Sequence, residues 1–106
     1  MSRPYIPLIP KRQPDLVNGG RDYAVYAGRL VVGRIYDFRR HGRDDWFWGL
    51  NRISTGDEIG EWYGTAEGFA GAKAAMRAAF DRWLAWADEP VADPMRAEAR
   101  QEIAKI

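Results

Sequence analysis

Cysteine is absent from this chain of 106 residues, and only one histidine is present. The absence of cysteine excludes disulfides, thiolate metal sites and cysteine nucleophiles, and it suits a reducing compartment. No apolar run is long enough to span a bilayer, and prolines interrupt the N-terminal stretch where a signal peptide needs an unbroken apolar segment. We therefore expect a cytoplasmic protein with no membrane contact.

Residues suited to catalysis are equally scarce. The only serines, Ser2 and Ser54, lack the pattern of a nucleophile elbow with a histidine and an acid to activate it. His41 lies near Asp44 and Asp45, but one imidazole and two loop carboxylates supply too few fixed ligands for a metal ion. The sequence thus predicts a protein that is not an enzyme and that uses no metal and no cofactor.

The composition is that of one folded domain with an unusual content of tryptophan. Hydrophobic residues make up 46% and charged residues 29%, which is close to the globular average. Five tryptophans in so short a chain need a structural or binding reason. Charge is divided unevenly: residues 1–56 hold 10 Lys/Arg against 5 Asp/Glu (+5), and residues 57–106 hold 6 against 10 (−4). This asymmetry is a weak indication of an anionic partner.

The pattern of residues up to position 64 predicts an extended segment followed by strands. Proline recurs every three or four positions within residues 1–20, which predicts a proline-rich extended arm. Residues 23–25 and 30–38 are rich in β-branched and aromatic side chains and predict a hairpin. Residues 46–53 predict a third strand, and residues 61–64 predict a short edge strand.

The period changes to that of a helix at position 69. One apolar face with spacings of three and four predicts a helix that ends before Pro90. Its members are Phe69, Ala72, Met76, Phe80, Trp83 and Ala87. Asp93 followed by Pro94 predicts the start of a short last helix over residues 93–106.

These elements predict an α+β fold. A three- to four-stranded antiparallel sheet is expected to be packed on one face by the C-terminal helix, with the arm and the short last helix as additions. The expected parts are therefore the arm (1–20), a sheet-plus-helix domain (21–89) and the last helix (93–106).

Strand alternation divides the aromatic and basic side chains between the two faces of the sheet. If Gly33 and Gly49 mark the side where the helix approaches closely, the opposite face collects aromatic rings and arginines. We expect this face to contain Arg34, Tyr36, Trp46, Trp48 and Arg52.

An exposed face of this kind suits contact with another macromolecule. The leading hypothesis is a non-catalytic binding module that contacts a protein partner, or a second copy of itself, through these side chains. The alternative is binding of nucleic acid by the same face, with phosphate or acidic-partner contacts from Arg39, Arg40 and Arg43 in the hairpin loop. A third reading stays open, in which the arm or the last helix covers this face and the tryptophans belong to the core.

Two resemblances accompany these residues. Arg34, Trp46, Trp48 and Arg52 on a sheet, with residues 64–67 leading into an alanine-rich helix, resemble in layout the plant ethylene-response-factor DNA-binding domain and the arm-binding domains of tyrosine recombinases. The resemblance covers about residues 30–87, and it implies that a three-stranded sheet enters the major groove with the helix behind it.

A second resemblance carries no known activity. Residues 46–51, together with Trp83-Leu84-Ala85-Trp86 at the end of the helix, resemble small uncharacterised bacterial proteins. This likeness is closer than the first.

Overall fold

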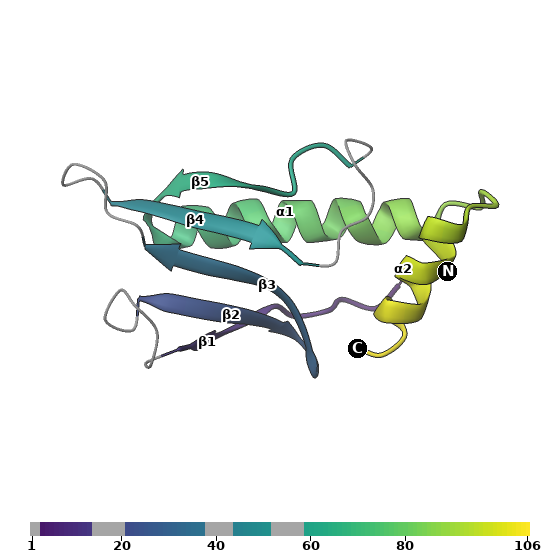
Figure 1. Cartoon of the computed structure of the whole chain (residues 1–106), viewed down its shortest axis with the longest axis horizontal. Coiled ribbons are helices and arrows are strands. Elements are labelled where there is room, and N and C mark those ends of the chain that lie inside the picture. The colour runs from purple at the N-terminus through teal and green to yellow at the C-terminus, as the bar shows by residue number, and fades with distance from the viewer. Residues whose placement is uncertain (1–2, 14–20, 38–43, 52–58) are drawn as a thin grey trace.

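The computed structural model describes residues 3–13, 21–37, 44–51 and 59–106. In these ranges, five strands form one antiparallel sheet in chain order, and two helices follow (Figure 1). The elements are β1 (Ile9–Arg12), β2 (Asp22–Ala27), β3 (Leu30–Asp37), β4 (Asp45–Leu50), β5 (Tyr63–Glu67), α1 (Gly68–Asp88) and α2 (Pro94–Ile103). The fold is therefore α+β, as predicted.

The sheet has more strands than predicted, because part of the expected arm is a strand. β1 pairs with β2 along its whole length, from Ile9 opposite Tyr26 to Arg12 opposite Tyr23. The N–H of Gln13 donates to the carbonyl of Asp22 at 2.8 Å, so alternate residues of β1 face β2 and the ring nitrogen of Pro10 faces the free edge. An edge strand tolerates proline there because no ladder hydrogen bond is lost. The proline spacing therefore did not distinguish a free arm from an edge strand.

The predicted hairpin is confirmed. β2 and β3 are joined by a tight turn in which Gly28 has a φ of +60°, a conformation that glycine adopts without steric cost. The register between these two strands shifts after Val25, at an irregularity of the bulge type.

α1 occupies the residues that the apolar period predicted. Its buried side chains are Ala72, Met76, Ala79, Phe80, Trp83, Trp86 and Ala87. The start of α2 is also confirmed, since Asp93 accepts a hydrogen bond from the N–H of Met95 at 2.9 Å and Pro94 opens the helix.

α1 lies along one face of the sheet, mainly over β4 and β5 and less over β3 (Figure 1). α2 packs against the C-terminal part of α1. There, the guanidinium of Arg96 lies 4.7 Å from the ring centroid of Trp86 and donates to its carbonyl at the end of α1. Within the described residues, neither helix is long and apolar enough to cross a membrane. One face of the sheet thus has helical cover, and the described residues leave the other face without it.

Candidate functional site: the open face of the sheet

Trp46 and Trp48 lie on the face that α1 covers. Their exposed fractions are 5% and 3%, so the expectation that they form an exposed surface is wrong. The reason is that Gly33 and Gly49 do not share a face. A Cβ at Gly33 would lie 2.7 Å from Cε of Met76 on α1, whereas a Cβ at Gly49 would lie 3.1 Å from the ring of Phe47, on the opposite face. The helix approaches Gly33 alone, and with it the side of the sheet that holds the tryptophans.

Each of the two buried indoles packs against other residues of this chain. The ring of Trp46 stacks on Phe69 from α1 at a centroid distance of 5.1 Å, and its Nε1 donates to Asp44 at 2.8 Å. The indole of Trp48 lies over Gly64 of β5, where an added Cβ would be 3.5 Å from Nε1. Both tryptophans are core residues, so they are withdrawn from the candidate surface.

The open face, opposite α1, is built from rows of residues that run across the strands. One row consists of Lys11, Ala24, Arg34, Gly49 and Tyr63. The next row consists of Asp22, Tyr36, Phe47 and Thr65. Two of the predicted site residues, Arg34 and Tyr36, are therefore on the open face, and Phe47 and Tyr63 take the places that the tryptophans were expected to fill.

The sequence contained a signal for Phe47. Alternation along β4 places it opposite to Trp46 and Trp48, and only the choice of face was in error. Tyr63 was missed although the expected edge strand at residues 61–64 contains it, because the pairing of that strand with β4, and hence the face of each side chain, was not predicted.

Three side chains at the centre of the open face form a continuous stack. The guanidinium carbon of Arg34 lies 4.4 Å from the ring centroid of Tyr36. The rings of Tyr36 and Phe47 follow at a centroid distance of 4.9 Å and a tilt of 32°. We call Arg34, Tyr36 and Phe47 the stack. Its side chains make cation–π and aromatic contacts, which are attractive and also favour particular relative orientations of the side chains.

Asp22 and Gly49 restrict the positions of the side chains in the stack. Arg34 makes a bidentate ion pair with Asp22, with Nε donating to Oδ1 at 2.9 Å, and Asp22 is only 1% exposed. The hydrogen bond to Asp22 raises the pKa of Arg34 above its ordinary value, against the opposing effect of partial burial. Gly49 has no Cβ, which would lie 3.1 Å from the ring of Phe47, so the ring has room beside the strand. The stack is therefore held in place before any partner arrives.

The stack remains accessible within the described part of the chain. The side chain of Arg34 is half exposed, and the rings of Tyr36 and Phe47 are partly exposed. Tyr63 beside them is 55% exposed. This is a flat, aromatic, partly cationic surface.

The other predicted site residues cannot be placed. Arg39, Arg40, Arg43 and Arg52 lie outside the described residues. No group of three or more metal-ligating side chains occurs in the described ranges.

Comparison with protein-family models, with curated proteins and with solved structures finds no match to this chain.

Proposed function

We propose that this chain is a non-catalytic binding module that self-associates through the open face of its sheet. The observation that carries the proposal is the stack, a preorganised arginine–aromatic cluster exposed at the centre of a sheet face. Arginine and aromatic residues dominate the binding energy of protein interfaces. Because the stack is already fixed by Asp22 and Gly49, little side-chain entropy remains to be lost on contact.

The charges of the open face favour a second copy as the partner. Lys11 lies at the β1 edge of this face, whereas Asp45 and Glu67 lie on the β4–β5 side. Arg34 and Asp22, between these edges, neutralise each other. A two-fold axis parallel to the strands would set the basic side of one copy over the acidic side of the other. Two sheets that pack in this way lie about 10 Å apart, with their inner side chains interdigitated. The stacks of the two copies would then meet near the axis.

Sedimentation velocity over a range of protein concentrations tests this proposal. The parent chain is expected to increase in mass from monomer toward dimer as concentration rises. Tyr36→Glu and Tyr63→Glu place a carboxylate in the interface twice, once from each copy, and are expected to remain monomeric. Val91→Glu is the matched control, because Val91 is exposed and lies outside the sheet, between α1 and α2.

Two results would refute self-association. One is a monomer mass that does not change with concentration. The other is a dimer that forms equally well in all three variants. Unfolding curves of each variant establish that a loss of dimer is not a loss of fold.

Nucleic-acid binding by the same face is the second candidate, since bases stack readily on aromatic rings presented by a sheet. The partly exposed rings of Tyr36 and Phe47 favour it. The charge of Arg34, however, is already compensated by Asp22, which leaves it less available to a phosphate.

Titration with random duplex and single-stranded oligonucleotides at low salt tests this candidate. Binding to phosphates weakens steeply with salt, with a log–log slope of about −0.9 per duplex phosphate contacted. A steep slope, with binding weakened by Tyr36→Ala, would support nucleic-acid binding. An absence of binding at low salt would dispose of it.

A further inference from the structure

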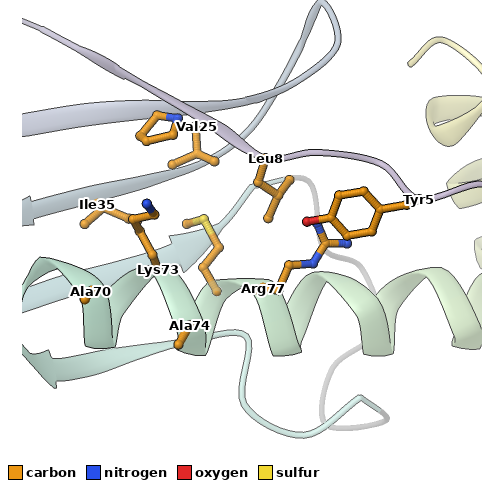
Figure 2. Close-up of a pocket in the computed structure, with 10 residues that line it drawn as sticks. Tyr5, Leu8, Val25, Ile35, Ala70, Lys73, Ala74 and Arg77 are labelled. Atoms are coloured by element: carbon orange, nitrogen blue, oxygen red, sulfur yellow. The ribbon is translucent and has the colours of Figure 1, made fainter.

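A pocket lies on the other side of the sheet, away from the open face. α1 covers β4 and β5 and leaves a space between its first half, the inner strands and the N-terminal segment (Figure 2). The pocket has a volume of about 430 Å³, within the range of small-molecule sites. Its lining is Tyr5, Leu8, Pro10, Val25, Ile35, Ala70, Lys73, Ala74, Met76 and Arg77.

Apolar side chains make up most of the walls. Leu8 comes from the N-terminal segment, Val25 and Ile35 from the sheet, and Met76 from α1. Val25, Ile35 and Met76 are buried, so the inner wall of the pocket is part of the hydrophobic core. Such walls favour an apolar ligand body by removing it from water.

The two cations of the pocket differ in their availability. Arg77 is occupied: it is paired with Asp81 and donates from Nη1 to the carbonyl of Ile6 at 2.6 Å. The hydrogen bond to Asp81 raises the pKa of Arg77. Lys73 has no carboxylate partner in the described part of the chain, where its Nζ lies 5.5 Å from the ring centroid of Phe69.

The position of Lys73 makes it available to a ligand. Figure 2 shows its side chain extending from α1 toward the sheet, at the opposite end of the pocket from Arg77 and Tyr5. Among the described residues, the pocket thus combines apolar walls with one positive charge that has no carboxylate partner.

We propose that this pocket is a binding site for a small amphipathic anion, such as an aliphatic or aromatic carboxylate. The apolar body lies against Leu8, Val25 and Met76, and the carboxylate pairs with Lys73. The site is independent of self-association, because none of its lining residues belongs to the stack. Bound ligand also bridges the N-terminal segment to α1, which couples occupancy to the docking of that segment.

Calorimetric titration with decanoate, decanol and decylamine tests the proposal, since the three differ in the charge of the head group. Decanoate is expected to bind most tightly and decylamine most weakly. Lys73→Met keeps the length and apolar character of the stem but removes the charge. It is expected to weaken decanoate binding about five- to tenfold and to leave decanol binding unchanged.

Two further variants complete the experiment. Lys105→Met is the matched control, since Lys105 lies after α2, pairs with Glu102 and is not one of the lining residues. It is expected to bind decanoate like the parent. Ala74→Leu fills part of the pocket while retaining a good helix former, and it is expected to weaken both decanoate and decanol.

The proposal is overturned if decanoate at millimolar concentration shows no saturable binding. It is also overturned if binding survives both Lys73→Met and Ala74→Leu in variants whose thermal unfolding matches the parent. Equal loss of decanoate and decanol binding in Lys73→Met would likewise contradict it, because the ammonium would then not recognise the anion.

Discussion

Replacing Gly33 by alanine probes the close approach of β3 to β4 and α1. The added Cβ would lie 2.3 Å from the carbonyl oxygen of Gly49 and 2.7 Å from Cε of Met76. The methionine terminus can rotate away, but the oxygen belongs to the backbone of β4 and cannot move without opening the β3–β4 ladder. Overpacking of a core costs about 1–3 kcal/mol, and a ladder hydrogen bond about 0.5–1.5 kcal/mol more. We therefore expect Gly33→Ala to lower the free energy of unfolding by about 2–4 kcal/mol.

Gly64→Ala is the matched control for this substitution. Gly64 is also a strand glycine with ordinary backbone angles, but its added Cβ would meet the ring of Trp48 at 3.5 Å, a normal contact distance. The expected change is within about 0.5 kcal/mol of the parent. Urea denaturation of both variants measures the difference, with the slope m unchanged if the unfolded states are alike. Equal stability of the two variants would refute the close approach of β3 and β4 at Gly33.

Two further predictions concern polar contacts. Arg34→Ala leaves the buried carboxylate of Asp22 without its bidentate partner. We therefore expect the free energy of unfolding to fall by about 1–3 kcal/mol. The double variant Asp22→Ala, Arg34→Ala is expected to regain part of this loss, because it removes the unpaired carboxylate. A double-mutant cycle by chemical denaturation measures this, and additive effects would contradict the coupling. Asp93→Ala removes the hydrogen bond to the N–H of Met95 and is expected to cost about 1 kcal/mol, whereas Asp93→Ser retains most of the stability. Amide exchange in α2 measures the loss, and equal exchange in both variants would argue against the cap.

Periodicity predicted the helices well because each is amphipathic or capped. The apolar spacing from Phe69 to Ala87 is incompatible with a strand, and its buried set matches that of α1 almost residue for residue. Asp93 and Pro94 similarly marked the start of α2 by a local hydrogen bond and a fixed φ.

The faces of the sheet could not be predicted in the same way. Both sides of β4 are aromatic, with Trp46 and Trp48 on one and Phe47 on the other, so hydrophobicity alone did not identify the buried side. The assumption that Gly33 and Gly49 share a face was wrong. Gly33 pairs with Leu50 and Gly49 with Arg34, and a shift of one residue in register places a side chain on the opposite face of the sheet. Pairing of β1 with β2 depends on contacts distant in sequence, which the proline spacing of that segment does not reveal.

Dilution of isotope-labelled protein, followed by amide chemical shifts, tests most directly whether the open face is an interface. Self-association through this face predicts that the amides whose shifts change on dilution cluster around Tyr36, Phe47 and Tyr63. The outer surfaces of α1 and α2 are expected to stay constant. Shifts that are independent of concentration, or that change on the helices instead, would contradict the account.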